Sequence, residues 1–392
     1  MRVLLVSSSS GSRGGGEFFL TYLGEALAEL GAEPALWVSS GQQMDELAEQ
    51  FASIGPVLRH PYRNTYLRRT RSFSHAFGAP VEMSAIADQW KAFQPDVIHL
   101  NKQCLEDGLD LLETASEMGI PHGCTIHITQ TAVELKAFLA GLRDRLARKA
   151  LRNYPGQLWA ISAQRARELQ VFTGQEAPVQ FIPNGVRIPD MEAVSESGAQ
   201  MRKQFFGERQ PDGPIAVCVG RIEEQKDPFR FLEILGQWKE SSPGLTGVWV
   251  GDGRLREPFE NKIREMGAAD WIRCAGWQPD PLPYLSMADV YVHPARFEGL
   301  PFALLEAMAH QLPCVISPSL ANELEEFPHD TWIIAGEDPS SWSNLVREAS
   351  AMERIGKQSR ERIVESFSIQ AMARSYMKLY ESLLDSWKGQ RS

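Results

Sequence analysis

Two glutamates, Glu298 and Glu306, stand eight positions apart in the stretch A-R-F-E-G-L-P-F-A-L-L-E-A-M-A. Residues 290–292 have the character of a short buried strand, and residues 302–310 have helical periodicity. Glu298 is therefore expected in the loop before a helix, and Glu306 inside that helix. A carboxylate in such a helix can accept hydrogen bonds from the paired hydroxyls of a ribose, and one in the loop can reach a sugar. The pair points to an enzyme that holds a nucleotide sugar.

The loop between the two glutamates contains groups that suit phosphate oxygens. A helix that begins just after a glycine-containing loop exposes unpaired amides and the positive end of its dipole. Gly299 and Leu300 are the candidate donors, because Pro301 has no amide hydrogen. The alternative for each glutamate is a solvated surface carboxylate. For Glu306 this alternative is harder to accept, because it lies in an apolar run and unpaired carboxylates are rarely buried.

A second candidate ligand loop follows the first expected strand, in S-S-S-S-G-S-R-G-G-G-E-F-F. Gly14, Gly15 and Gly16 directly precede an expected helix, so the backbone there can approach a ligand closely. The loop is not a dinucleotide fingerprint, because Phe19 falls where the last glycine of G-x-G-x-x-G would be. Taken alone, three glycines fit a plain flexible turn equally well.

Two cations follow the first expected strand of the second half of the chain, in A-V-C-V-G-R-I-E-E-Q-K-D-P. Arg221 comes directly after Gly220, and Lys226 lies five residues further on. Arginine as a planar fork and lysine as a point charge can together bind a diphosphate. The alternative is a pair of surface cations that form ion pairs with Glu223 or Glu224.

Two histidines lie at the ends of apolar strands. His127, in T-I-H-I, can donate to a sugar hydroxyl or to a departing phosphate. His99, in D-V-I-H-L, is a candidate contact for an acceptor. A lone histidine at the end of a strand is more often structural, so both interpretations stay open.

Basic and aromatic residues alternate in one segment of the first half. They are Arg59, Tyr62, Arg63, Tyr66, Arg68, Arg69, Arg71 and Phe73. Arg63 and Arg68 are the predicted acceptor contacts, either for an anionic acceptor or for anionic lipid headgroups. A basic helix face at residues 143–152 adds to this charge, and a solvated surface is the alternative for both segments. The membrane hypothesis is rejected if the protein does not co-sediment with anionic liposomes at low salt.

The elements that must position these groups alternate between strand and helix, which predicts α/β architecture with parallel sheets. Strands are expected at 2–7, 34–38, 96–100, 123–128, 157–161, 179–182, 215–219, 246–250, 272–275, 290–292, 314–316 and 332–334. Helices are expected between several of them, including 18–30, 132–150 and 369–387. Ligands bind such sheets at the carboxyl ends of the strands.

Two Rossmann-like domains that face each other across a cleft are predicted from this pattern. A stretch rich in proline, glycine and serine, from residue 183 to about 213, is interpreted as the linker. The predicted boundaries are 1–186 for the first domain, 187–368 for the second, and 369–392 for a C-terminal helix.

The E-x7-E stretch resembles the signature of retaining glycosyltransferases of the GT-B fold, particularly the large family 4 group. The resemblance implies that Glu298 contacts hydroxyls of the donor sugar and that Glu306 holds the nucleotide ribose. The segment G-R-I-E-E-Q-K-D is similar to the G-R-x-x-x-x-K-G motif of that family, whose cations hold the donor diphosphate. Asp227 stands where the motif usually has glycine.

Other segments extend the resemblance. It implies that Gly15 and Gly16 line the donor phosphate and the acceptor side, and that Gly251, in V-W-V-G-D-G, lies near the base. His127 matches the functional histidine that the family places after this strand, although the acid that often follows it is absent. The family's Gly-Gly pair after the E-x7-E helix is missing, and Glu323 is the candidate match for the acid beyond that pair.

By this resemblance the first domain binds the acceptor, the second binds the donor, and the C-terminal helix crosses back to the first. The implied reaction moves a hexosyl unit, with retention, from a nucleotide diphosphate sugar to a hydroxyl acceptor in glycan, glycolipid or polysaccharide biosynthesis. A UDP-sugar is the favoured donor and GDP-mannose the next. No cofactor and no metal are expected, because D-x-D is absent and Arg221 and Lys226 can neutralise the diphosphate. The alternatives are a sugar-nucleotide epimerase, a phosphorylase, or a nucleotide-binding module without catalysis.

Composition agrees with a globular enzyme of two ordinary domains. The chain has 392 residues, of which 43% are hydrophobic and 23% charged. A net charge of −10 argues against a general nucleic-acid binder. Five scattered cysteines without a C-x-x-C pair indicate neither disulfides nor zinc, so a reducing cytoplasm is expected. Peripheral contact with the inner face of a membrane is a hypothesis, and the sequence predicts no oligomeric state.

Overall fold

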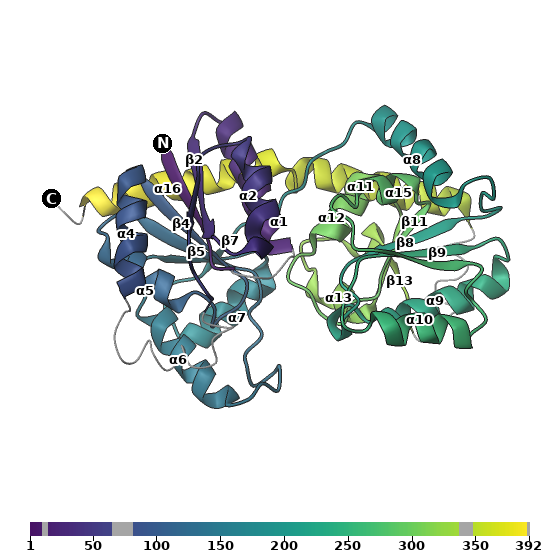
Figure 1. The fold of residues 1–392 in the computed structure, drawn as a ribbon, viewed down its shortest axis with the longest axis horizontal. Helices are drawn as coiled ribbons and strands as arrows, with labels where there is room; N and C mark the ends of the chain where they lie inside the picture. Colours follow the sequence, from purple (N-terminus) through teal and green to yellow (C-terminus); the bar gives the residue numbers. More distant parts are fainter. Residues whose placement is uncertain (10–14, 65–80, 337–347, 390–392) are drawn as a thin grey trace. The chain divides into compact units, whose positions relative to one another are not determined.

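Two separate parallel sheets form the framework of the chain (Figure 1). The computed structural model describes residues 1–9, 15–64, 81–336 and 348–389. One compact unit comprises Met1–Gly185 together with Ile369–Ser392, and the other comprises Val186–Ser368. The predicted α/β class, with a Rossmann-like sheet in each half, is confirmed.

The sheet of the first unit has, within the described residues, seven parallel strands in the order β3-β2-β1-β4-β5-β6-β7. The strands are β1 (Arg2–Ser7), β2 (Glu33–Ser39), β3 (Val57–His60), β4 (Val97–Lys102), β5 (His122–Ile126), β6 (Gln157–Ala160) and β7 (Gln180–Phe181). The order reverses between β1 and β4, and the carboxyl ends of strands at such a reversal are where open α/β sheets bind ligands. Strand β3 was not predicted, because V-L-R-H is short and half polar.

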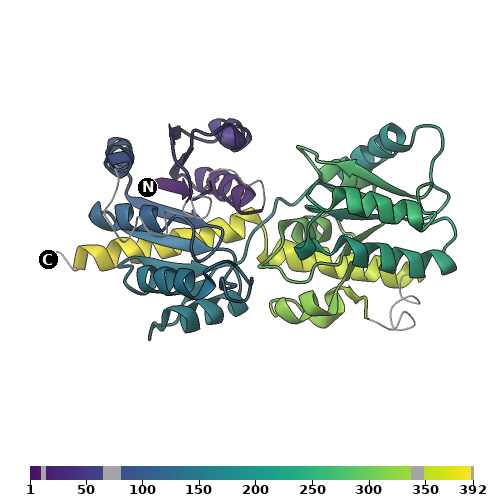
Figure 2. The same cartoon turned by 60° about the horizontal axis from the view of Figure 1, so that its bottom comes forward.

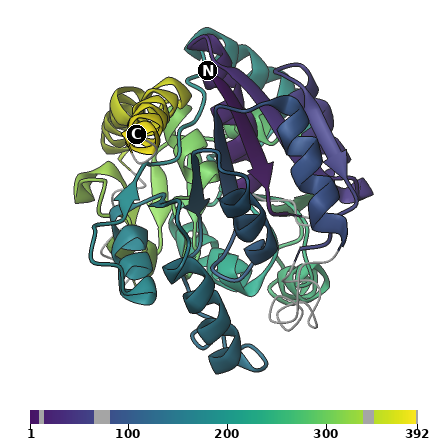
Figure 3. The same cartoon turned by 90° about the vertical axis from the view of Figure 1, so that its left-hand side faces the viewer.

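Helices cover both faces of this sheet (Figures 1 and 3). They are α1 (Gly15–Glu29), the 3-10 helix η1 (Gln42–Met44), α2 (Asp45–Ala52), α4 (Val81–Phe93), α5 (Leu109–Glu117), α6 (Ala140–Arg152), α7 (Ala163–Thr173) and α16 (Ile369–Gly389). The helix expected at 132–150 begins only at Ala140. The residues before it form turns because the Asp144 carboxylate, on α6, accepts hydrogen bonds from the amides of Ala132 and Val133.

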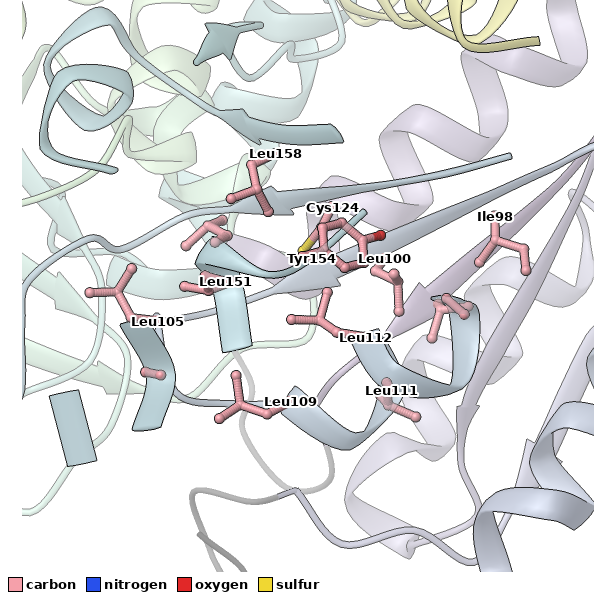
Figure 4. Packing of buried hydrophobic residues seen from close by; sticks show 14 of the residues in the cluster. Ile98, Leu100, Leu105, Leu109, Leu111, Leu112, Cys124, Leu151, Tyr154 and Leu158 are labelled. Carbon is pink, nitrogen blue, oxygen red and sulfur yellow. The ribbon is translucent and has the colours of Figure 1, made fainter. Parts of the chain in front are cut away.

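The core under α5 shows why this helix lies on the sheet (Figure 4). Leu109 and Leu112 on α5 are buried, as Ile98 and Leu100 on β4 are, and all four belong to one apolar cluster. Burying a leucine side chain contributes about 1.5–3 kcal/mol. The packing of α5 fixes β4, and with it the polar residues at the carboxyl end of that strand.

The last helix, α16, belongs to the first unit although it ends the chain, and Figure 2 shows it (yellow) beside α1 (purple). His99 on β4 links it to the sheet. Its Nδ1 atom lies 2.6 Å from the hydroxyl of Tyr380, and its Nε2 atom lies 2.8 Å from the hydroxyl of Thr125. The Thr125 hydroxyl is also 2.9 Å from that of Tyr376. Buried polar groups that satisfy one another in this way hold α16 in one position.

The second unit has its own sheet, with six parallel strands in the described residues in the order β10-β9-β8-β11-β12-β13. The strands are β8 (Ile215–Val219), β9 (Thr246–Val250), β10 (Ile272–Gly276), β11 (Val290–His293), β12 (Cys314–Ile316) and β13 (Ile333–Ile334). The helical segments are α8 (Met191–Phe206), η2 (Glu224–Lys226), α9 (Pro228–Ser241), α10 (Arg256–Glu265), α11 (Leu282–Met287), α12 (Phe302–Ala309), α13 (Pro318–Glu323), η3 (His329–Thr331) and α15 (Ala349–Ser366).

The interpretation of residues 183–213 as a linker is wrong for most of that stretch, because α8 occupies it. Asp190 caps this helix by accepting hydrogen bonds from the amides of Glu192 and Ala193 at 2.9 and 3.1 Å. Gly198 lies against the backbone of α11. The glycines and prolines therefore mark the ends of a helix and a close helix contact.

None of the described helices combines the length and the apolar character that crossing a bilayer would require.

The buried His99 predicts a pH dependence of stability for the first unit. Burial, with a smaller effect of His127, lowers the pKa of His99 to about 3 from an ordinary value of 6.5. The unfolded chain therefore binds a proton between these values while the folded chain does not. Stability should fall as the pH drops below 6.5, by up to about 1.4 kcal/mol per pH unit for this group.

His99→Gln should cost about 1–3 kcal/mol at neutral pH and should flatten this acid dependence. Unfolding followed by circular dichroism between about pH 5 and pH 7 checks it. His60→Gln serves as the control, because His60 is only half-buried. A slope equal to that of the unmodified protein would contradict the prediction.

Candidate functional site

The strand order of the second unit reverses between β8 and β11, and the groups predicted from sequence gather at the carboxyl ends of these two strands. Gly220 and Arg221 follow β8, and His293 ends β11. Two loops meet here: the amide of Arg296 donates to the carbonyl of Gln225 at 2.9 Å. Gln225 in turn donates from Nε2 to the carbonyl of Phe297 at 3.2 Å.

An ion pair between Lys226 and Glu298 forms the centre of this site. Both groups are largely buried, with exposed side-chain fractions of 17% and 10%. Burial alone would raise the pKa of Glu298. The charge of Lys226 and the neighbouring His293 outweigh burial and lower this pKa to about 2. Glu298 is therefore an anion at physiological pH and can accept hydrogen bonds from hydroxyl groups.

His293 belongs to this site, although no role was predicted for it from the sequence. It is buried, with Nδ1 2.9 Å from the hydroxyl of Tyr291 and Nε2 3.5 Å from Oε1 of Glu298. Burial lowers its pKa against the raising effect of Glu298, so the ring is neutral at pH 7. The signal in the sequence that could have identified His293 is its position at the end of a central strand.

Glu323, the candidate match for the acid beyond the E-x7-E helix, lies at the end of α13. One of its carboxylate oxygens accepts a hydrogen bond from the amide of Glu298 at 2.9 Å. Ser317, which caps α13, donates to the carbonyl of Ala295 at 2.5 Å. These two contacts hold the loop that carries Glu298.

Arg221 is exposed and forms no ion pair with any residue that the structure describes. The alternative left open from the sequence, an ion pair of Arg221 with Glu223 or Glu224, is therefore not formed. Glu223 pairs with Arg254 at 2.5 Å, which leaves the Arg221 guanidinium available to a ligand.

Gly251, the predicted neighbour of the base, follows β9 with φ 141°. A Cβ atom there would lie 2.1 Å from the carbonyl oxygen of Gly220, so the close approach of the two loops requires glycine. Nε1 of Trp249 donates to the same carbonyl at 2.8 Å and fixes its direction.

The departure of Asp227 from the usual glycine has a local explanation. This residue has φ 46°, a left-handed conformation that glycine adopts freely and that aspartate tolerates. Its side chain accepts a hydrogen bond from the amide of Arg230, which caps α9, and pairs with Arg296 at 2.8 Å. The backbone shape of the motif is therefore retained.

Glu306 lies in the second turn of α12, as predicted, and is 9% exposed. Gly299 and Leu300 are buried immediately before this helix. Glu306 is therefore not a solvated surface carboxylate.

In the first unit, His127 follows β5 and takes part in a chain of hydrogen bonds. Its Nε2 atom lies 2.7 Å from Oδ1 of Asn101, and Nδ2 of Asn101 donates to the carbonyl of Gly16 at 2.9 Å. A carbonyl can only accept, so the amide nitrogen of Asn101 must face Gly16 and its oxygen must face His127. His127 must then carry its proton on Nε2.

Burial lowers the pKa of His127 to about 3, so the ring is neutral. Its Nδ1 atom has no hydrogen bond to any described residue. From the sequence, His127 was expected to donate to a sugar hydroxyl or to a departing phosphate. In the structure, Nε2 of His127 donates to Asn101 instead. Nδ1 remains as an acceptor for a hydroxyl group. Asn101 was missed because nothing in its local sequence shows the contact with Gly16.

The two glycines predicted for the first unit open helix α1. Gly15 is exposed and Gly16 is buried. A Cβ atom on Gly16 would lie 1.9 Å from the side chain of Gln103.

The predicted acceptor contacts of the first unit are His99, Arg63 and Arg68. His99 has no exposed surface and both its ring nitrogens are bonded within the core, so its expected acceptor role is withdrawn. Arg63 is exposed, and Arg68 lies outside the described residues.

Among the described residues, no group of three or more histidine, cysteine, aspartate or glutamate side chains is arranged to hold a metal ion.

The chain belongs to the group 1 glycosyltransferases with the GT-B fold. Residues 200–367 match the family described as glycosyl transferases group 1, and residues 13–188 match glycosyltransferase family 4. The two matches together take in most of both units.

Among individual relatives, the chain is 30% identical over 198 residues to UDP-Gal:alpha-D-GlcNAc-diphosphoundecaprenol alpha-1,3-galactosyltransferase of Escherichia coli, covering 49% of this chain and 51% of that protein. It is 26% identical over 176 residues to the lipopolysaccharide core biosynthesis glycosyltransferase LpsE of Rhizobium meliloti, covering 44% and 51%. The matches thus span about half the length of these curated relatives. The crystal structure of Anabaena Alr3699/HepE in complex with UDP has the same fold, with a TM-score of 0.74, 15% identity, and coverage of 97% of this chain and 100% of that one.

The Asn101 contact predicts the protonation of His127. Asn101→Leu should remove the preference for a proton on Nε2, and the neutral ring should populate both tautomers. Nitrogen-15 NMR of the imidazole at neutral pH measures this distribution. The exposed Asn153 provides a control, Asn153→Ala, which should leave the spectrum unchanged. A proton on Nδ1 in the unmodified protein would overturn the assignment.

The Lys226–Glu298 pair predicts strong coupling between two substitutions. Lys226→Met should destabilise the second unit by about 3–5 kcal/mol, because it leaves a buried carboxylate without its partner. It should also raise the pKa of Glu298. Adding Glu298→Gln should restore part of the loss, and a double-mutant cycle of unfolding free energies measures the coupling. Lys262→Met, which breaks an exposed pair with Glu265, is the control. Additive effects would contradict the prediction.

Proposed function

We propose that this protein transfers a hexosyl unit from a nucleotide diphosphate sugar to a hydroxyl acceptor in polysaccharide or glycolipid biosynthesis. The observation that carries the proposal is the buried ion pair of Glu298 with Lys226, at the point where the strand order of the second sheet reverses. The arrangement offers a carboxylate for sugar hydroxyls beside cations for phosphates.

Each part of the donor has a candidate partner in the second unit. The diphosphate takes Arg221 and Lys226, together with the amides of the loop that begins at Gly299. The hydroxyls of the sugar donate hydrogen bonds to Glu298, and those of the ribose donate to Glu306. This assignment follows the covalent order of the donor, in which the diphosphate joins the ribose to the sugar.

A UDP-sugar is the proposed donor, and GDP-mannose is the second candidate. The name of the relative from Escherichia coli specifies UDP-Gal. Structures of the Anabaena protein contain UDP and UDP-glucose. These donors belong to other proteins, and the similarity of sequence and fold supports the proposal here.

The acceptor is proposed to bind the first unit, near His127. A neutral ring with Nδ1 as acceptor suits a hydroxyl of a sugar. Arg63 is retained as a proposed acceptor contact. The acceptor of the relative from Escherichia coli is named as diphosphoundecaprenol-linked, and we propose a lipid-linked acceptor for this protein too. Such an acceptor implies peripheral contact with a membrane.

Transfer is proposed to proceed with retention, without a metal ion or a resident cofactor. Arg221 and Lys226 offset the charge that develops on the leaving diphosphate, as preorganised cations do in other sites. The diphosphate itself takes the proton of the acceptor hydroxyl. In this route Glu298, which pairs with Lys226, orients the sugar and does not attack it. Anomeric NMR of the first product tests retention.

The test of the donor site is calorimetric binding of UDP, GDP and ADP without added metal. One diphosphate should bind selectively, and Glu306→Ala should weaken it roughly 10- to 100-fold through lost hydrogen bonds to the ribose. Glu240→Ala is the matched control. Glu240 is exposed near the end of α9, at the opposite edge of the sheet.

Equal binding to the unmodified protein and Glu306→Ala, or no binding at all, would remove the basis of the proposed site. Two other activities are then distinguished by their products. Interconversion of a sugar nucleotide without an acceptor would identify an epimerase, and phosphate-dependent cleavage of a glycan would identify a phosphorylase.

A further inference from the structure

Large apolar side chains are exposed at one place in the first unit far more than elsewhere. Of the eleven such side chains in the described residues, five fall between residues 133 and 142. They are Val133 (56% exposed), Leu135 (47%), Phe138 (75%), Leu139 (48%) and Leu142 (40%). Single exposed apolar residues need no explanation, but a group of five within ten residues does.

The backbone holds these side chains in a defined conformation. Asp144 accepts hydrogen bonds from the amides of Ala132 and Val133 at 2.7 and 3.1 Å. Lys136 and Leu139 have φ of 51° and 54°, which is strained for residues with these side chains. The apolar turn is thus fixed to α6 by a buried carboxylate.

Helix α6 continues this surface with positive charge. Leu142, Arg145, Lys149 and Arg152 are exposed and share one face by their spacing, whereas Asp144, Ala147 and Leu151 are buried on the opposite face. The cations of the exposed face form no ion pair with any residue that the structure describes. Arg143 differs, because it pairs with Glu106 at 2.5 Å and ties α6 to its unit. Figure 3 shows α6 at the margin of the first unit.

We propose that the surface formed by residues 133–152 docks on an anionic lipid bilayer. The chain as a whole has a net charge of −10, yet this segment contains six basic residues and two acidic ones. One of the two acids, Asp144, is buried and bonded to the turn. A surface of apolar side chains flanked by cations is complementary to the acyl boundary and to the phosphates of a bilayer.

The chemistry favours a bilayer over a protein partner. The exposed cations of α6 directly follow the apolar turn, so one continuous segment offers apolar side chains for the acyl boundary and cations for lipid phosphates. Docking would bring the first unit to a lipid-linked acceptor, and this role, but not the docking itself, rests on the proposed function.

The test is co-sedimentation of the full chain with vesicles of phosphatidylcholine, alone and mixed with phosphatidylglycerol, at low and high salt. Binding is expected to the mixed vesicles, and it should weaken as salt rises. Phe138→Ser with Leu142→Ser should reduce the bound fraction at least roughly tenfold through lost apolar burial. Arg145→Gln with Lys149→Gln should have a similar effect through lost attraction to lipid phosphates.

Two matched control variants remove exposed apolar or basic side chains from other parts of the chain. Val171→Ser removes an apolar side chain that is 83% exposed on α7, and Lys262→Gln with Arg264→Gln removes two exposed cations on α10. Both should bind as the unmodified protein does. Circular dichroism of every variant confirms that it is folded.

Three results would overturn the proposal: no binding to mixed vesicles, equal binding by the surface variants and the controls, or self-association in sedimentation velocity that the surface variants abolish. The last would identify the surface as a contact between copies of this chain. Calorimetry of UDP, GDP and ADP separates this proposal from the proposed function. Vesicle binding without binding of any of the three diphosphates would reject the function and keep the docking surface, and the reverse result would do the opposite.

Discussion

The ion pair between Lys226 and Glu298 is the interaction on which the site of the second unit depends. Burying either charge alone carries a large desolvation cost, and their mutual attraction offsets much of that cost. The pair joins the loop after β8 to the loop after β11, two strands adjacent in the sheet but 72 positions apart in sequence at this contact. Contacts from Gln225, His293 and Glu323 then fix the same loops.

The first unit uses the same topological feature with neutral groups. Its strand order reverses between β1 and β4, where Gly16 and Asn101 meet, and His127 comes from the next strand, β5. A hydrogen-bond chain ordered by a backbone carbonyl decides where the histidine proton lies. One unit thus presents a fixed charge and the other a fixed tautomer, each built at the end of parallel strands.

Much of this was predictable from sequence because it is local. A loop after a strand, a glycine that opens a helix and a glutamate at helical spacing can each be recognised from adjacent residues. The positions of Gly16, Arg221, Glu298 and Glu306 in their loops and helices were therefore predicted, and their roles stay predictions. Partners distant in the chain were not. His99 looked like a ligand group because its contact with Tyr380 spans 281 positions, and Asn101 showed no sign of its role. The start of α6 was misplaced for the same reason, since Asp144 stabilises turns that its sequence alone would extend as helix.

The ion pair also gives a physical account of how donor binding would proceed in the proposed function. Without a donor, Lys226 and Glu298 neutralise each other. A diphosphate brings a second anion to Lys226, and the lysine can then be shared without leaving its charge unpaired. Glu298, less tightly held, gains hydrogen bonds from the hydroxyls of the sugar that the same donor carries. Each exchange is less favourable alone than with the intact donor, because a free nucleotide supplies no sugar hydroxyls to Glu298 and a free sugar supplies no anion to Lys226. A site of this kind favours the intact donor over either of its halves.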